Sequence, residues 1–419
     1  MADSEPVLIS GGQVFDGEHE ELTRRDVLVA DGRIRLVTGA GDAVPDDVLR
    51  IDADGRVVMP GLIDAHWHMV FAPNAMSNLE AADTGLMYAH AVAEAQATLM
   101  RGFTTVRDTG GPTFGLKTAI DSGVIAGPRV YPSGALISQT AGHGDFAPAY
   151  AAAPQFGGSR SRFEEIGAFY VADGPEAVYA AVRTQLRKGA SQIKLALGGG
   201  VISTSDPIDV LQYTEEEIRV GVRLAADWGT YVCAHVYTVE GVQRAVAAGV
   251  KSIEHGHMVD EATLALMAEH DVWLSLQPFQ AGDNPLSPEQ VKKAEPTSHW
   301  DRVAAWAKAE GVRVAFGTDV LFQPGMTGIQ SQMLTRLEKV FGAAGALRIA
   351  TSQNGSLLAL SGRRNPYGDA PLGVIRDGAW ADVLVVDGNP LEDISLIGRP
   401  DSSLAVIMKD GVLQRNRLS

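Results

Sequence analysis

Short apolar runs broken by turn residues fill the first part of the chain, up to about residue 57. Residues 27–29, for example, are followed by Asp31 and Gly32. Aspartate and glycine accept positive φ values at low cost, so such pairs predict tight turns between strands. The pattern therefore predicts a small all-β unit at this end of the chain.

The same pattern returns in residues 378–390 and 404–412. Each terminal piece has about 50 residues, and so short a segment buries too little surface to be stable alone. We therefore expect the two pieces, residues 1–58 and 371–419, to form one β-sandwich domain. Residues 59–370 are then inserted between them as a second domain.

Between the terminal pieces, apolar strands alternate with helical segments, which is the signature of βα units and a parallel sheet. The helical segments are rich in alanine and stop at glycine: residues 176–187 run towards Gly189, and residues 239–248 end at Gly249. Eight βα units predict an α/β fold, a (β/α)8 TIM barrel. The expected strands are residues 61–66, 104–108, 129–133, 192–197, 231–236, 252–255, 272–277 and 313–317.

Two connections are longer than helix packing requires. Residues 139–174 follow the third expected strand, and residues 282–297 follow the seventh. Long loops at the strand ends of a barrel usually carry binding groups, so we expect the first to be a lid or a substrate loop. The glycines at 198–200 lack the Gly-Lys-Ser/Thr of a phosphate loop, and they favour a close approach of the backbone to substrate.

The composition narrows the class of protein. The net charge is −16, and 45% of the 419 residues are hydrophobic. A negative balance argues against nucleic acid or an anionic membrane as a partner. No apolar run approaches the roughly 18 residues of a membrane span, the N-terminus does not resemble a signal peptide, and Cys233 is the single cysteine. A cytoplasmic globular protein is expected.

Two histidines, His66 and His68, stand at the end of the first expected barrel strand. Side chains in a strand alternate with period two, so both point to the same side and can reach one metal ion. Imidazole is the commonest metal ligand, but a lone His-x-His pair is equally compatible with a structural role. The rest of the chain has to supply the missing ligands.

The other expected strands carry further reactive side chains near their carboxyl ends. Lys194 lies in the fourth strand, His235 and His255 end the fifth and sixth, and Asp319 follows the eighth. Because the carboxyl ends of barrel strands converge on one face, these residues are expected to meet there. His257 could share a side with His255, but we expect it to lie already in the loop.

Asp319 and Lys194 indicate a specific chemistry. A carboxylate beside a metal-bound water can orient that water and take its proton, and we prefer this role for Asp319 over that of a helix cap. Lys194 has apolar neighbours, and burial lowers the pKa of an amine. A neutral amine can add carbon dioxide to give a carbamate, whose two oxygens can bridge two cations.

A strand-1 His-x-His, a strand-4 lysine, single histidines on strands 5 and 6 and a strand-8 aspartate resemble the amidohydrolase superfamily in its binuclear, carboxylated-lysine form. The terminal β pieces resemble the companion β-sandwich of that superfamily, so the resemblance covers essentially the whole chain. Shorter motifs are similar to its imidazolonepropionase-like and prolidase-like branch. They are Thr140-Ala141-Gly142-His143-Gly144-Asp145, residues 194–201, His235-Val236-Tyr237-Thr238, Ile253-Glu254-His255-Gly256 and Gly317-Thr318-Asp319.

The resemblance implies hydrolysis of the amide bond of Xaa-Pro or other Xaa-amino acid dipeptides, N-acyl amino acids, or amides such as ochratoxin A. It also implies two divalent metal ions, with zinc favoured over manganese, cobalt and nickel. The implied ligands are His66, His68 and Asp319 for the first metal, His235 and His255 for the second, and the Lys194 carbamate, formed with carbon dioxide, as the bridge.

By the same resemblance, a hydroxide between the metals attacks the amide carbon and Asp319 relays a proton to the leaving amine. His143 is implied as a catalytic and substrate-binding residue that contacts the carbonyl or carboxylate of the substrate. Tyr237 is implied to bind the terminal carboxylate. The expected partner is a small amide with a free carboxylate, and a homo-oligomer is expected from the family.

Two other functions stay open at this point. One is the opening of a cyclic amide, as in imidazolonepropionase or hydantoinase. The other is a non-catalytic assembly protein on the same fold, although the full set of ligands argues against it. A deaminase is disfavoured, because such enzymes typically carry glutamate three residues after the strand-5 histidine and this chain has Thr238 there.

Overall fold

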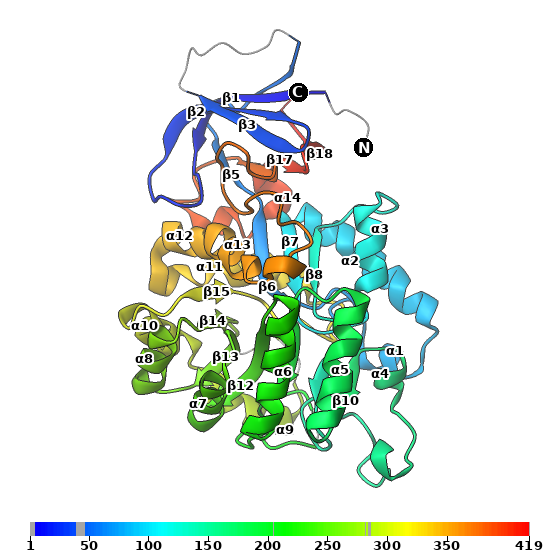
Figure 1. The fold of residues 1–419 in the computed structure, drawn as a ribbon. Helices are drawn as coiled ribbons and strands as arrows, with labels where there is room; N and C mark the ends of the chain where they lie inside the picture. Colours follow the sequence, from blue (N-terminus) through cyan, green and yellow to red (C-terminus); the bar gives the residue numbers. More distant parts are fainter. Residues whose placement is uncertain (1–4, 39–46, 204, 281, 284–285, 419) are drawn as a thin grey trace.

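The structure, a computed structural model, describes residues 5–38, 47–203, 205–280, 282–283 and 286–418. Strands from both ends of the chain form one sheet at the top of Figure 1, and a barrel lies below it.

The chain runs directly from β5 (Val57–Pro60) of the terminal sheet into β6 (Leu62–Trp67), the first barrel strand. The parallel strands of the barrel therefore start near the terminal sheet, and their carboxyl ends lie at the far end (Figure 1).

The expected β-sandwich from both termini is confirmed. Its strand order is β18-β17-β16-β5-β1-β2-β3, with β4 paired to β1. Asp31 and Gly32 form the predicted turn between β2 and β3. The division of the chain at residues 58 and 371 stays a prediction; β5 is paired in this sheet as far as Pro60. The other strands are β1 (Val7–Val14), β2 (Thr23–Ala30), β3 (Arg33–Thr38), β4 (Leu49–Asp52), β16 (Val383–Val386), β17 (Leu404–Lys409) and β18 (Val412–Asn416).

All eight expected barrel strands are present, and each overlaps its predicted range. Hydrogen-bonded neighbours within the barrel are parallel, as the alternation of strands and helices predicted. Besides β6, the strands are β7 (Phe103–Asp108), β8 (Arg129–Pro132), β11 (Ile193–Ala196), β12 (Val232–Thr238), β13 (Ser252–Met258), β14 (Trp273–Leu276) and β15 (Val314–Phe316).

The third barrel strand is split into two pieces. Its first piece, β8, pairs with β7, whereas its second piece, β9 (Leu136–Ser138), pairs with β11 through Ile137 and Leu195. The segment 139–174 thus leaves from the barrel wall itself. It contains β10 (Phe169–Val171), which pairs with β9, so part of this expected loop is regular structure.

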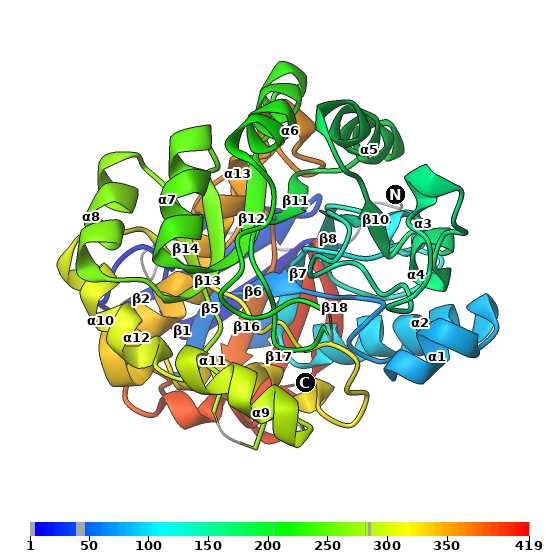
Figure 2. The same cartoon turned by 90° about the horizontal axis from the view of Figure 1, so that it is seen from below.

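Helices form a ring around the strands when the barrel is viewed along its axis (Figure 2). The two helices predicted to stop at Gly189 and Gly249 do so. Among the described residues, no helix combines the length and apolar character needed to cross a bilayer. The α-helices are α1 (Met76–Ala81), α2 (Thr84–Met100), α3 (Phe114–Asp121), α4 (Arg162–Glu165), α5 (Pro175–Lys188), α6 (Glu215–Trp228), α7 (Val239–Ala248), α8 (Glu261–Glu269), α9 (Pro288–Ala294), α10 (Trp300–Ala309), α11 (Gln330–Thr335), α12 (Glu338–Arg348), α13 (Asn354–Ala359) and α14 (Pro400–Ser403).

One side chain, that of Asn354, ties the last barrel strand to the first. Its Nδ2 donates to the carbonyl oxygens of Ile63 in β6 (2.7 Å) and Phe316 in β15 (2.8 Å). Its Oδ1 accepts from the backbone N–H of Phe316 at 3.0 Å. Asn354 is fully buried, so these backbone groups have no access to solvent there. The amide of Asn354 therefore supplies hydrogen bonds to backbone groups of both β6 and β15, where the barrel closes.

Replacing Asn354 with Ala should lower the free energy of unfolding by about 3 kcal/mol, because three buried backbone groups lose their partner. Urea unfolding measures the change. The control is Gln353→Ala, one residue earlier and only partly buried, which should change stability by less than about 0.5 kcal/mol. Equal unfolding midpoints for the two variants would contradict the role of Asn354.

Candidate metal centre and active-site cavity

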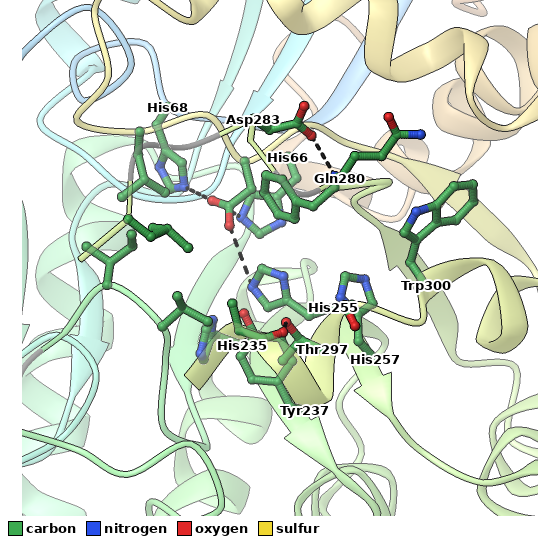
Figure 3. A pocket seen from close by; sticks show the side chains of 18 of the residues that line it. His66, His68, His235, Tyr237, His255, His257, Gln280, Asp283, Thr297 and Trp300 are labelled. Atoms are coloured by element: carbon green, nitrogen blue, oxygen red, sulfur yellow. Dashed lines mark hydrogen bonds and ion pairs between the residues drawn. The ribbon is translucent and has the colours of Figure 1, made fainter. Parts of the chain in front are cut away.

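His66, His68 and Asp319 come together at the carboxyl ends of β6 and β15. One donor atom from each lies within 4.8 Å of the other two, so the group could hold a metal ion. Asp319 Oδ1 is 3.2 Å from His66 Nε2 and 3.0 Å from His68 Nε2. Figure 3 shows the imidazoles of His66 and His68 in the cavity wall near His255. The expected convergence of the first and last strands is thus observed.

The outer ring nitrogens of both histidines are already engaged. His66 Nδ1 lies 2.7 Å from Glu254 Oε2, and His68 Nδ1 lies 2.9 Å from the carbonyl oxygen of Gly110. Since carboxylate and carbonyl oxygens only accept, each Nδ1 carries the proton. In a neutral ring protonated on Nδ1, the Nε2 lone pair is available to a metal ion at the cluster. In a doubly protonated ring, Nε2–H donates to Asp319 Oδ1 instead.

The backbone holds Asp319 against His66. The N–H of Asp319 donates to the His66 carbonyl at 2.8 Å, and Asp319 has φ of 52°, which is unusual for a residue other than glycine. A Cβ at Gly317 would lie 2.3 Å from the His66 Cβ, so only glycine allows this approach. Burial raises the pKa of Asp319, but His66 and His68 outweigh it and hold that pKa well below its usual range.

A buried ion pair, which the sequence analysis missed, lies beneath the cluster. Arg107 of β7 donates to both carboxylate oxygens of Glu254, at 2.7 and 2.8 Å, and both side chains are fully buried. Burial raises the pKa of Glu254, but Arg107 and His66 more than offset it and hold the carboxyl ionised. The signal was a carboxylate, Glu254, directly before the strand-end histidine His255 in β13, a strand that faces the barrel interior.

His255 follows Glu254 directly, yet both face the barrel interior. Strict alternation would turn His255 away, but it has φ of 77°, and the pairing of β12 with β13 shifts register after it. The kink brings the His255 ring to 5.2 Å from the His66 ring, centroid to centroid. Its Nε2 is 4.0 Å from Asp319 Oδ2. His255 therefore stands at the edge of the cluster.

Lys194 and His235 line the same cavity. The Lys194 side chain is 1% exposed, and no described residue offers its Nζ a hydrogen bond. Burial lowers the pKa of the Lys194 amine, as predicted. His235 Nε2 lies 3.1 Å from the Gly199 carbonyl oxygen. His235 is not part of the group formed by His66, His68 and Asp319. Burial is the main reason why the pKa of His235 lies well below its usual value, and the neighbouring His143 lowers that pKa further.

His143 reaches the site from the 139–174 segment. Its ring stacks on His235 with centroids 3.9 Å apart, and its Nδ1 lies 2.8 Å from Ser203 Oγ. A Cβ at Gly200 would lie 1.9 Å from the His143 ring. The glycine at 200 therefore makes room for a side chain of this protein, whereas the sequence suggested an approach to substrate.

Tyr237 lies two residues after His235, at the end of β12. Its ring stacks against His255, with centroids 4.8 Å apart, and meets the His235 ring edge-on at 5.1 Å. The side chain is buried, and burial raises the pKa of its phenol, which stays protonated. Tyr237 can therefore donate a hydrogen bond into the cavity.

The prediction that His257 lies in the loop after the sixth barrel strand is wrong: His257 lies within β13. It is buried and lines the cavity. Its Nε2 has no hydrogen-bond partner among the described residues. Burial lowers the pKa of His257 to about 4. Figure 3 places its ring between His255 and Trp300.

These residues line one cavity of about 950 Å³. Beside His68, four phenylalanines form an aromatic bay, made of Phe71, Phe146, Phe169 and Phe322. Successive ring centroids in the bay are 4.8 to 5.5 Å apart, and the Phe71 ring stacks on His68. The cavity thus has an apolar side and a polar side. The polar side is lined by residues such as His257, Gln280, Thr297 and Trp300.

A barrel with histidine and carboxylate donors at the carboxyl ends of its strands is the architecture of metal-dependent barrel enzymes. Comparison with known families agrees. The model of the amidohydrolase family matches residues 57–413, which is most of the chain. The protein belongs to the amidohydrolase family, as the sequence motifs predicted.

Individual relatives lie in the predicted branch. The chain is 33% identical to ochratoxinase from Aspergillus niger over an alignment of 434 residues, covering 97% of this chain and 86% of the relative. A crystal structure of a prolidase complexed with N-methylphosphonate-L-proline matches with a TM-score of 0.89 at 35% identity, covering 98% of this chain and all of that one. A Xaa-Pro dipeptidase with bound methionine matches with a TM-score of 0.83 at 30% identity, covering 98% and 100%.

If a divalent metal ion binds at His66, His68 and Asp319, Glu254→Gln should weaken its binding by about 10- to 100-fold, because a neutral amide oxygen accepts the His66 Nδ1 proton more weakly than a carboxylate does. Competition with a zinc chelator measures the affinity. Ser252→Ala is the matched control, since Ser252 donates to Glu254 at 2.7 Å but leaves the bonds to Arg107 and His66 in place. Zinc affinity that is lowered equally in the two variants, or in neither, would argue against this role for Glu254.

Proposed function

We propose that the protein is a metal-dependent amidohydrolase that cleaves an amide bond next to a free carboxylate. The substrates are dipeptides, Xaa-Pro or other Xaa-amino acids, N-acyl amino acids, or ochratoxin-type amides. The observation that carries the proposal is the cluster of His66, His68 and Asp319 beside the buried, unpartnered amine of Lys194. The names of the relatives, ochratoxinase, prolidase and Xaa-Pro dipeptidase, support the substrate class.

The chain fits a pair of divalent metal ions. A charged or neutral amine without partners is costly in the barrel interior, and a carbamate on Lys194 turns it into a metal ligand. Zinc suits the imidazole and carboxylate donors. Six residues would hold the pair: His66, His68 and Asp319 the first ion, His235 and His255 the second, with carboxylated Lys194 as a shared ligand.

When bound, the metals supply a water molecule of lowered pKa and a Lewis acid for the amide carbonyl. Asp319 takes the proton of the attacking water and passes it to the leaving amine nitrogen. His143, stacked on His235, orients the carbonyl or carboxylate of the substrate. The protonated phenol of Tyr237 donates a hydrogen bond to the terminal carboxylate. Their positions around one cavity support these roles.

The aromatic bay favours a substrate that carries an apolar group on one side of its scissile bond. Its rings lie next to His68, so a group that fills it lies beside the proposed first metal. Burial of an apolar side chain there favours binding in proportion to the area removed from water. Homo-oligomerisation stays a prediction from the family.

The direct test compares metal-free with zinc-loaded protein on a panel of dipeptides, N-acyl amino acids and ring amides. We expect hydrolysis of the linear amides only in the loaded protein. Equal rates without metal would end the proposal, and hydrolysis of the ring amides alone would favour the cyclic-amide hypothesis.

Lys194→Ala should remove at least one metal ion per chain and abolish hydrolysis, because the bridging ligand is gone. Mass spectrometry of the metals gives the stoichiometry. Lys188→Ala is the control, since Lys188 is exposed at the end of α5 and should leave both readouts unchanged. An unchanged metal content in Lys194→Ala would refute the bridging role.

Phe146→Ala should raise KM about tenfold for the more apolar member of a substrate pair, because the bay loses one wall. The pairs are phenylalanyl-proline with glycyl-proline, and N-acetylphenylalanine with N-acetylglycine. The matched control is Phe156→Ala, in the same 139–174 segment but 82% exposed. If KM for neither apolar substrate changes, the aromatic bay does not bind substrate.

A further inference from the structure

His257 has no role in the chemistry described so far, although it is buried in the cavity wall. Its ring centroid is 6.0 Å from that of His255 and 6.0 Å from that of Tyr237. A group that contacts His257 would therefore be adjacent to one held at either of those residues. This position is within reach of the atoms that flank the scissile amide.

The hydrogen bonding of His257 leaves one nitrogen available. Its Nε2 is buried and has no hydrogen-bond partner among the described residues. In a neutral ring with the proton on Nδ1, Nε2 is an acceptor only. A buried acceptor without a donor is costly, and a ligand that brings an N–H removes the cost.

The charges around the cavity favour a cationic donor. Among the described cationic side chains that line the cavity, Arg336 pairs with Asp283 and Lys339 pairs with Asp301, and Lys194 is the residue proposed to carry the carbamate. Glu338 is exposed at the rim and forms no ion pair with a described residue. An ammonium group that enters the cavity therefore finds an unneutralised carboxylate at the rim, that of Glu338, and a free acceptor in the wall, His257 Nε2.

We propose that His257 Nε2 accepts a hydrogen bond from the α-ammonium group of the substrate, so that His257 selects dipeptides over N-acyl amino acids that lack this group. The inference rests on the proposed amide hydrolysis and narrows its substrate class. His257 is a specificity-determining residue that touches substrate and takes no part in bond cleavage.

The test uses zinc-loaded enzyme and two substrates that differ only in the amino group, leucyl-proline and 4-methylpentanoyl-proline. In the wild type, KM should be about tenfold lower for leucyl-proline. His257→Leu should raise KM for leucyl-proline about tenfold and leave KM for the other substrate, kcat and zinc content unchanged. His257→Gln, which offers an amide oxygen, should restore most of the preference. His270→Leu, at the exposed end of α8, is the control for loss of a histidine.

Equal shifts of KM for both substrates, or none for either, would overturn the role of His257. Binding of the acyl-side products, leucine and 4-methylpentanoate, is measured in parallel by calorimetry and needs no turnover. If the wild type hydrolyses neither substrate, the proposed function fails. A preference for leucine that His257→Leu removes would still support the role of His257, and equal binding of the two products would overturn it.

Discussion

The site depends on one buried carboxylate. Glu254 lies between Arg107 and His66, and it has no contact with solvent. The guanidinium keeps the carboxylate charged, and the carboxylate fixes the proton of His66 on the outer nitrogen. The ion pair of Arg107 and Glu254 inside the barrel therefore sets the orientation of His66 at the end of β6. A buried ion pair adds little to stability on average, so its role here is to orient His66.

The position of His143 in the cavity wall depends on contacts between loops. Lys293 of α9 donates to the carbonyl oxygens of Gly200, Ser203 and Asp206. The same stretch of backbone leaves room for the ring of His143 and offers it the Ser203 hydroxyl. Segments from three parts of the chain therefore set the position of one imidazole. These contacts hold the His143 ring against His235 on one side of the cavity.

The sequence was a good guide to the strands and to the convergence of His66, His68 and Asp319, because hydrophobic periodicity and the parallel barrel fix both. It did not foresee Glu254, since alternation alone cannot tell which charged residue of β13 meets a partner. His257 was misplaced because the kink at His255 extends β13. Tertiary contacts, absent from any local pattern, decided each of these cases.

The two pieces of the split third strand have different roles in this fold. Its first piece, β8, keeps the register with β7, while its second piece, β9, begins the segment that carries His143 and Phe146. The residues of the cluster at Asp319 stand on other strands. A change in the length of the 139–174 segment would therefore alter the wall that carries His143 and Phe146, while the strands that carry His66, His68 and Asp319 keep their pairing.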